Sequence, residues 1–321
     1  MAREDQIGTG WGLGDCIVTV LSHGLSWIDL VFLGRPHAIA TAVIQSAGGV
    51  ALVDPGPTSC LRTLEEGLQR QGVKWADVQQ LLLTHIHLDH AGAAGTIVRA
   101  HPHIKVFVHE RGAVHMAEPQ KLIDSARRLY GDDMDRLWGE FAAVPRESMV
   151  VLSGGERIEA GGRRFEVAYT PGHASHHVSY FDVASGVAFV GDTAGVRIDE
   201  GYVLPPTPPP DIDLEAWRSS VAVIEGWFPD TLFLTHFGPV MTPRPHLQAL
   251  LQNLDEMANW VRRTLADPGT DEERSRAFAD QLRHAMRQQM NEAQMASYPV
   301  AAPFEMLWLG LARYWRKKDR A

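Results

Sequence analysis

The chain has 321 residues, of which 45% are hydrophobic and 21% charged, a composition typical of folded globular proteins. Its formal net charge of -9 argues against a broad basic surface, so we expect no nucleic-acid partner. No apolar run approaches the ~18 residues that cross a bilayer, and we therefore expect no membrane partner.

The opening segment and the cysteines bear on the compartment. Residues 1–20 are acidic early and lack a basic stretch that leads into a continuous apolar run, so they do not resemble a secretory signal. Cys16 and Cys60 are the only cysteines, which excludes a dense disulfide framework and fits a reducing compartment. We therefore expect a cytoplasmic protein.

The first part of the chain predicts alternating strands and helices. Residues 39–54 contain two β-rich runs joined at Gly48-Gly49, which indicates a hairpin. Apolar residues at helical spacing predict a helix over residues 60–71, closed by Gly72. The patterns that follow predict a buried strand over 80–84, a helix over 91–100 and a strand over 104–108.

The middle of the chain predicts a helical insertion and then a second β-rich half. Residues 116–147 are charged and helix-like, and the half after them has expected strands at MVVLS, RRFEVAYT, HVSYFDV and VAFVG. Residues 204–211 are rich in proline, which lacks a backbone donor and fixes its own φ. We expect a loop there, close to the functional site, followed by a helix over 213–227 and a strand over 231–235.

After Pro245 the pattern predicts helices only. Thr270 and Glu273 form a capping box for a second helix that reaches about residue 296, and Pro303 opens a third helix with Trp308 and Trp315 on one face. Such an aromatic face is typical of core packing or of a homodimer interface, and we interpret residues 316–318 as a solvated tail. We divide the chain into a catalytic domain over 1–245 and a C-terminal helical extension over 246–321.

The segment after the strand predicted over 80–84 has the strongest chemical signal. It places His85, His87, Asp89 and His90 within six positions of an abrupt loop, so that their side chains surround a small volume. Imidazoles and a carboxylate without a thiolate suit Zn, Fe, Mn or Co. One ion alone would rarely use all four groups. The alternative interpretation is a polar loop whose histidines lie at the surface or cap the next helix.

This segment resembles the HxHxDH signature of the metallo-β-lactamase superfamily. Thr170-Pro171-Gly172-His173, Phe189-Val190-Gly191-Asp192 and Thr235-His236-Phe237-Gly238-Pro239 resemble its later motifs, in the order that the family has them. Val53-Asp54-Pro55-Gly56 resembles its early aspartate turn, and the resemblance spans about residues 25–242. It implies an α+β fold, a four-layer αββα sandwich with the site at one edge of two sheets, followed here by a C-terminal helical appendage.

The resemblance also implies a role for each motif residue. His85, His87 and His173 would hold one metal ion, while Asp89, His90 and His236 would hold a second and Asp192 would bridge them. Asp54 would orient one of the ligand histidines. The cofactor is then two divalent ions, most simply Zn, with Fe or Mn as alternatives. Two such ions generate hydroxide at neutral pH, and Asp89 would orient this hydroxide or move its proton.

A complete ligand set predicts a dinuclear hydrolase. The pattern is similar to glyoxalase II-like and lactonase-like members, which hydrolyse thioesters or lactones of small molecules, although the insertion, the proline-rich loop and the helical tail depart from glyoxalase II. One alternative is a persulfide-dioxygenase-like oxidoreductase with a single iron on His85, His173 and Asp192. The other is a catalytically silent sensor that uses the pocket without turnover.

The remaining polar candidates carry weaker signals. Arg35, Arg197 and Arg244 are candidates for contact with an anionic substrate group, although each is equally typical of a surface arginine. His176 and His177 follow His173 closely and are expected to lie beside the pocket rather than to bind metal. Four further histidines are expected to be structural, namely His101, His103, His109 and His115.

Overall fold

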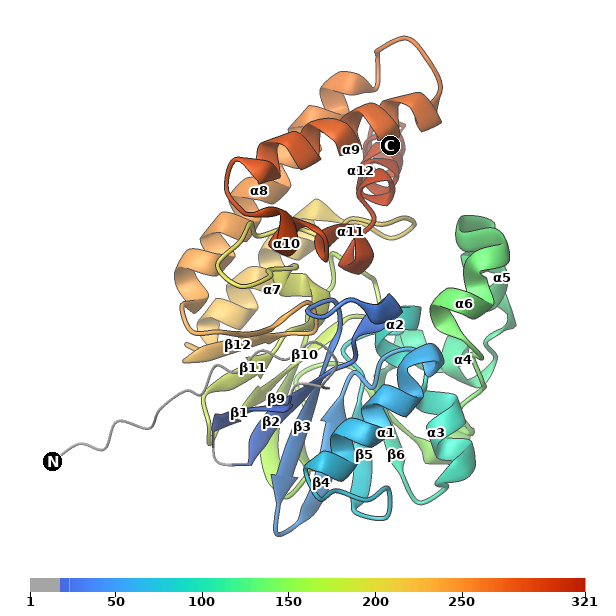
Figure 1. Ribbon diagram of the computed structural model, residues 1–321, viewed down its shortest axis with the longest axis vertical. Coiled ribbons are helices and arrows are strands. Elements are labelled where there is room, and N and C mark those ends of the chain that lie inside the picture. Colours follow the sequence, from blue (N-terminus) through green and yellow to red (C-terminus); the bar gives the residue numbers. More distant parts are fainter. Residues whose placement is uncertain (1–17, 23, 321) are drawn as a thin grey trace, which may run out of the picture.

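The computed structural model describes residues 18–22 and 24–320. Cys16 and residues 1–17, on which the prediction about a secretory signal rests, lie outside the described residues. Two β-sheets lie face to face with helices on their outer faces, and further helices lie above one end of the sandwich (Figure 1). Within the described ranges, no helix is long and apolar enough to cross a membrane.

The first sheet has seven strands in chain order. Its first four strands are antiparallel, and β4 to β7 are parallel. Its strands are β1 (Val18–Ser22), β2 (Leu25–Asp29), β3 (Ala40–Ser46), β4 (Gly49–Val53), β5 (Val78–Leu82), β6 (Lys105–His109) and β7 (Met149–Leu152). We expected β7 to open the second β-rich half, and this was wrong. It pairs with β6, because the helical insertion supplies the long crossover that a parallel pair needs.

The second sheet has six strands in the order β13-β12-β11-β10-β9-β8. Both β9 and β11 are antiparallel to β10, and β12 is parallel to β11, so β9, β11 and β12 run in the same direction. Its strands are β8 (Arg157–Ala160), β9 (Arg163–Tyr169), β10 (Val178–Asp182), β11 (Val187–Phe189), β12 (Thr231–Leu234) and β13 (Gly238–Val240).

The helices follow the expected order, with shifted ends. They are α1 (Leu61–Arg70), α2 (Leu88–Ala91), α3 (Ala94–Ala100), α4 (Glu110–Ala117), α5 (Gln120–Tyr130), α6 (Met134–Trp138), α7 (Leu214–Gly226), α8 (Pro243–Thr264), α9 (Asp271–Arg287), α10 (Glu292–Met295), α11 (Tyr298–Ala301) and α12 (Phe304–Lys318). The single helix expected over 91–100 is two helices. The helix expected to reach residue 296 ends at Arg287, although its capping box of Thr270 and Glu273 is present.

Three apolar cores separate the four layers. Successive residues of a strand point to opposite faces, and β4 shows this clearly: Leu52 packs beneath α1 and α3, whereas Val53 packs between the sheets. In the second sheet Phe233 faces the first sheet, and its neighbour Leu234 faces the helices. The chain therefore has the expected αββα arrangement, with an apolar core on both faces of each sheet.

The C-terminal helices share the outer core of the second sheet. Trp308 on α12 is buried in the same apolar cluster as Trp217 on α7 and Leu234 on β12. The aromatic face of α12 is thus core packing within the chain. Residues 316–318 belong to α12 and are not a free tail, because Arg316 pairs with Asp271 and Lys318 pairs with Glu215. The domain boundary at residue 245 stays a prediction.

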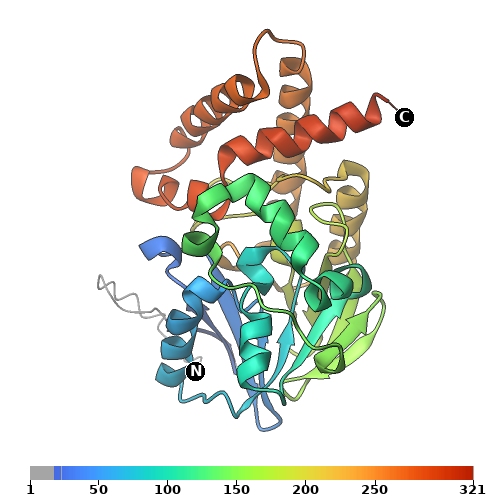
Figure 2. The same ribbon diagram turned by 90° about the vertical axis from the view of Figure 1, so that its right-hand side faces the viewer.

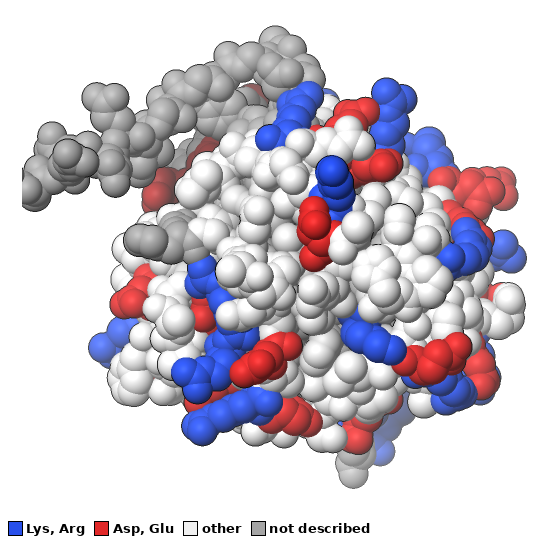
Figure 3. Space-filling model, turned by 90° about the horizontal axis from the view of Figure 1, so that it is seen from below, with Lys and Arg blue, Asp and Glu red and all other residues white. Residues whose placement is uncertain are grey.

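Charged side chains of both signs are mixed over the face seen in Figure 3. On that face Lys and Arg lie beside Asp and Glu rather than in one basic patch. The expectation that the chain has no nucleic-acid partner agrees with this one face and stays a prediction.

Candidate metal centre

All seven predicted ligands lie at one edge of the two sheets. The loop after β5 carries His85 and His87, and the short α2 carries Asp89 and His90. In the second sheet, β9, β11 and β12 end at the same edge because they run in the same direction. The turns after these three strands carry His173, Asp192 and His236. Strand ends thus anchor ligands that are up to 151 positions apart in the chain, from His85 to His236.

The first group of candidate ligands is His85, His87, His173 and Asp192, whose ligand atoms lie within 4.8 Å of one another. His87 Nδ1 lies 2.9 Å from both His85 Nε2 and His173 Nε2. Asp192 Oδ2 lies 3.3 Å from His173 Nε2. Three nitrogens and one oxygen that face a common point are a donor set suited to a first-row divalent ion.

The second group is Asp89, His90 and His236. His236 Nε2 lies 3.2 Å from His90 Nε2 and 3.3 Å from Asp89 Oδ2. Asp192 Oδ1 lies 3.3 Å from His90 Nε2, while its other oxygen faces the first group. The Asp192 carboxylate therefore lies between the two groups, where a bridging ligand would lie.

Hydrogen bonds on the far side of the rings determine which nitrogen faces the cluster. His173 Nδ1 donates to the Pro206 carbonyl at 2.8 Å, and His236 Nδ1 donates to the Ala38 carbonyl at 2.5 Å. Each ring then has its proton on Nδ1 and its lone pair on Nε2, toward the cluster. His90 follows the same rule through Asp54, described below. Metal ligands generally need such partners to fix ring orientation and tautomer.

Asp54 joins the two sheets beneath the cluster. Its carboxylate is fully buried and accepts hydrogen bonds from the Thr84 amide at 2.8 Å and the Thr84 hydroxyl at 2.7 Å. Asp54 Oδ2 also accepts from His90 Nδ1 and from the Thr235 hydroxyl, each at 2.8 Å. The Thr84 hydroxyl in turn accepts from His85 Nδ1 at 3.1 Å. The structure thus places Asp54 in contact with a candidate ligand, as its proposed orienting role requires.

The two groups differ in their protonation. Burial, together with the neighbouring histidines, lowers the pKa of His85 well below its usual value and that of His87 to about 4. Burial also opposes the charged form of His90 and His236, but the carboxylates of Asp192 and Asp89 outweigh it and raise both pKa values. His90 and His236 therefore hold a proton more strongly than His85 and His87 do.

The cluster fits a pair of cations on its own geometry. Asp192 Oδ1 is buried and has no hydrogen-bond partner within the described part of the chain. The Nε2 lone pairs of His90 and His236 face each other and need a proton or a cation between them. Nitrogen and oxygen donors without sulfur are compatible with Zn, Fe or Mn.

Comparison with known proteins decides the family. The family model described as the metallo-beta-lactamase superfamily matches residues 34–236, which is more than half of the chain. The chain belongs to the metallo-beta-lactamase superfamily. The matched range ends at His236, the last of the candidate ligands.

Relatives agree with this membership. A metallo-beta-lactamase fold-containing protein of Sulfurisphaera tokodaii is 29% identical over 185 residues, which cover 56% of this chain and 69% of that protein. A hydroxyacylglutathione hydrolase of Legionella pneumophila is 24% identical over 155 residues, or 48% of this chain and 46% of that enzyme. A crystal structure that matches this chain is that of a metallo-beta-lactamase family protein from Thermus thermophilus, with a TM-score of 0.66 at 23% identity. The match covers 88% of this chain and 89% of that chain, and it supports the fold.

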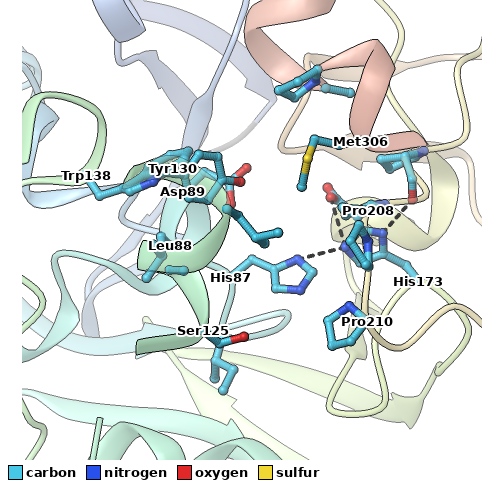
Figure 4. Close-up of a pocket in the computed structure, with 18 of the residues that line it drawn as sticks. His87, Leu88, Asp89, Ser125, Tyr130, Trp138, His173, Pro208, Pro210 and Met306 are labelled. Atoms are coloured by element: carbon cyan, nitrogen blue, oxygen red, sulfur yellow. Dashed lines mark hydrogen bonds and ion pairs between the residues drawn. The ribbon is translucent and has the colours of Figure 1, made fainter. Parts of the chain in front are cut away.

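A cavity of about 620 Å³ reaches the cluster of this superfamily member. His87, Asp89, His173 and Asp192 line its metal end. Figure 4 shows Tyr130, Trp138 and Leu88 on one side of His87, with Met306 and Pro208 on the other. Its walls come from the insertion helices α5 and α6, the proline-rich segment 206–210 and the segment from α11 to α12. We expected the proline-rich loop to lie near the site, and it does.

The proline-rich segment is held from both sides. Pro206 accepts the His173 hydrogen bond, and Thr207 Oγ1 donates to the Leu307 carbonyl on α12 at 3.0 Å. Gly310 on α12 approaches so closely that a Cβ there would lie 2.0 Å from the Thr207 carbonyl oxygen. The C-terminal helix therefore supports the backbone to which a candidate ligand is hydrogen-bonded.

Several site residues were missed from the sequence. Thr84 and Thr235 each precede a ligand histidine at a strand end, a repeated Thr-His pair that could have identified both. The arginines proposed for an anionic group, Arg35, Arg197 and Arg244, do not line the described cavity. The cations that do line it are Arg111 on α4 and Lys121 and Arg128 on α5.

The other histidines divide between structure and cavity. His103 Nε2 bonds the Val78 carbonyl at 3.1 Å, and His109 stacks on Tyr169 with ring centroids 4.5 Å apart, both structural as expected. His176 lines the cavity. His115 also lines it, which the expectation of a purely structural role did not include.

Proposed function

We propose that this chain is a metal-dependent hydrolase that holds two divalent ions, most simply Zn²⁺, and cleaves a thioester or a lactone of a small molecule. The observation that carries the proposal is the position of Asp192, whose two carboxylate oxygens face two separate groups of ligand atoms. A site for a single ion has no use for the second group.

The ligands divide as the motif order suggests. His85, His87 and His173 would hold one ion, Asp89, His90 and His236 would hold the other, and Asp192 would contact both. Such a pair of ions, when bound, supplies a water of lowered pKa and polarises a carbonyl oxygen. No Ser or Cys nucleophile is then required.

Asp89 is the residue that we assign to proton handling. Burial opposes ionisation of its carboxyl group, but His90 and His236 outweigh burial and lower its pKa to about 2. Asp89 is therefore ionised at neutral pH, and it lines the cavity where a substrate would lie. An ionised carboxylate there can accept a hydrogen bond from the attacking water and orient it.

The choice of ester-like bonds rests on likeness. The name of the Legionella relative describes hydrolysis of an acyl derivative of glutathione. The alignment with that enzyme covers nearly half of this chain. That name supports testing thioesters first, with lactones as the next class.

The test is metal content followed by turnover. Mass spectrometry of protein purified without added metal should give about two equivalents of Zn, Fe or Mn per chain, and the loaded protein should hydrolyse an acyl thioester or a lactone. Asp89→Ala should lower kcat by at least ~100-fold. Asp211→Ala, a cavity-lining aspartate outside both ligand groups, is the matched control and should retain most activity.

Two results would overturn the proposal. One iron per chain with no hydrolysis of either class would favour a mononuclear oxidoreductase. Protein that binds no divalent ion even after incubation with Zn²⁺ would favour a sensor.

A further inference from the structure

We infer that the substrate is amphipathic: a thioester whose acyl group is medium or long and apolar and whose other part carries an anionic group. This inference rests on the proposed hydrolase function and names its substrate class. It follows from the size of the cavity and from the different chemistry of its walls. At about 620 Å³ the cavity lies well within the range of sites for drug-sized ligands, whereas an acetyl thioester would leave much of it to water.

One wall is aromatic and aliphatic. Trp138 is buried and stacks on Phe32 with centroids 5.4 Å apart, and Tyr130 meets its ring edge-on at 5.2 Å. Across from them lies Met306 of α12 (Figure 4), and its neighbour in sequence, Leu307, also lines the cavity. Covering such a surface with an acyl chain removes apolar area from water on both sides, at about 0.8 kcal/mol per buried CH₂.

Another part of the cavity is cationic. Lys121 and Arg128 lie seven positions apart on α5, so they share a face of the helix, and both line the cavity. Within the described residues no salt bridge engages Lys121, Arg128 or Arg111. By contrast, Arg136 on α6 and Arg146 after it are paired with Asp133 and Glu118, so an anionic group that enters the cavity would not have to displace a protein carboxylate from Lys121 or Arg128.

The acidic groups of the cavity do not neutralise these cations. Asp89 and Asp192 belong to the metal ligand groups, where the ions would balance their charge. Asp211, which accepts a hydrogen bond from Ser175 Oγ at 2.8 Å, supplies one negative charge against the three cations that line the cavity. A substrate carboxylate or phosphate would therefore meet a net positive wall, with Ser125 on the same face of α5 as an additional donor.

The experiment is a matched set of four thioesters. S-acetyl and S-octanoyl derivatives of N-acetylcysteamine, which is neutral, and of N-succinylcysteamine, which carries a carboxylate, separate the two features. We expect the octanoyl compounds to exceed the acetyl compounds in kcat/KM by on the order of 100-fold, because part of six additional CH₂ groups is buried. The thioesters of N-succinylcysteamine should exceed the matching thioesters of N-acetylcysteamine in kcat/KM by about fivefold, as for an exposed charge pair.

Variants assign each preference to its wall. Arg128→Gln should remove most of the preference for the succinyl compounds, mainly through KM, and Arg127→Gln is its matched control because Arg127 is the adjacent exposed arginine and does not line the cavity. Met306→Trp should lower the ratio of octanoyl to acetyl kcat/KM at least tenfold, because the added volume fills the apolar site.

The outcomes separate this inference from the function on which it rests. Hydrolysis of all four compounds at similar kcat/KM would overturn the inference and leave the hydrolase proposal standing. Equal effects of Arg128→Gln and Arg127→Gln would overturn its anionic part. If metal-loaded protein hydrolyses none of the four, nor any lactone, the hydrolase proposal fails first.

Discussion

Asp54 is the single residue on which most of the cluster depends. Its Oδ2 accepts from Thr84, His90 and Thr235, so in Asp54→Asn three donors would face an amide NH₂. If the amide turns instead, its NH₂ meets the Thr84 backbone donor, and in both orientations the neutral amide holds the His90 Nδ1 proton less strongly than the carboxylate does. We expect a 10- to 100-fold loss of affinity for the second ion and a destabilisation of ~2 kcal/mol. Metal content after dialysis and urea unfolding measure these effects.

A second buried aspartate provides the control. Asp182 accepts hydrogen bonds from Arg163 and Ser185 and lies at the end of β10 that is remote from the cluster. Asp182→Asn should destabilise the fold without changing metal content. Equal metal loss in both variants would refute a specific role for Asp54.

The protonation of the two groups predicts their pH dependence. Imidazole must be neutral to bind metal, and the raised pKa values of His90 and His236 mean that the second ion displaces protons. In the first group the pKa values of His85 and His87 are lowered, so these imidazoles are neutral at pH 7 and bind metal without losing a proton. Affinity for the second ion should therefore rise between pH 6 and 8, by up to about tenfold per pH unit for each proton displaced.

Zinc titrations by calorimetry in buffers of different ionisation enthalpy report the protons released at each step. Identical proton release for both ions at neutral pH would contradict the assignment.

At the level of residues, local motifs were predictable and distant contacts were not. The histidine-rich loop could be recognised from the sequence because its four candidate ligands lie within six positions. The structure brings all seven candidate ligands together. Whether they bind metal stays a prediction. Arg128 could not be selected from the sequence, since nothing local distinguishes it from Arg127, and only the packing of α5 directs one of the two toward the cavity.

Among the elements, α12 is the one that supports the site from outside the sandwich. Gly310→Ala would place a methyl group against the Thr207 carbonyl and the Pro208 backbone, so the helix or the proline-rich segment must move. We expect a loss of ~1–3 kcal/mol in unfolding free energy. Because Pro206 accepts from His173, affinity for the first ion should fall as well.

Gly226→Ala on α7 is the matched control, since its added methyl would meet nothing within 4 Å. It should be neutral or stabilise by up to ~1 kcal/mol. Thermal unfolding and metal content of both variants decide the matter, and a Gly310→Ala protein as stable as Gly226→Ala would exclude tight packing of α12 on the segment.

Element types were more predictable than their partners. Periodicity and the capping box at Thr270 indicated many of the strands and helices, whereas β1 and β2 were not predicted from the sequence. The sheet to which β7 belongs could not be inferred, because a short apolar run fits either sheet and only the crossover through α4 to α6 decides. The short β8 and β13 carry too few residues for a period to be visible.

For the molecule as a whole, the ligands come from both sheets, so bound metal should stabilise the docking of one sheet on the other. Removal of metal with a chelator should lower the Tm by on the order of 10 °C, since each tightly bound ion contributes about 4 kcal/mol at a thousandfold excess over its Kd. Differential scanning fluorimetry before and after chelation and after return of Zn²⁺ measures this change. An unchanged Tm in protein shown to be metal-free would contradict it.

The layered architecture was predictable because the motifs occur in family order, and the family in turn implies two sheets. The cavity was not, because Trp138, Met306 and Pro208 meet only after the insertion and the C-terminal helices have packed on the sandwich. In Figure 2 the insertion helices, in green, lie below the C-terminal helices, in red, and residues of both line the cavity although they are far apart in sequence.

The candidate metal ligands lie in the segments that follow strand ends, whereas the aromatic, proline-rich and cationic walls come from segments outside the two sheets. Substitutions in the candidate ligand segments and substitutions in the cavity walls should therefore have different effects. A descendant can acquire a new substrate through substitutions on α5, α6 or α12 while Asp54 and the histidines stay unchanged. Random libraries confined to those helices should yield active members with altered selectivity, whereas libraries at the strand ends should yield mostly inactive ones.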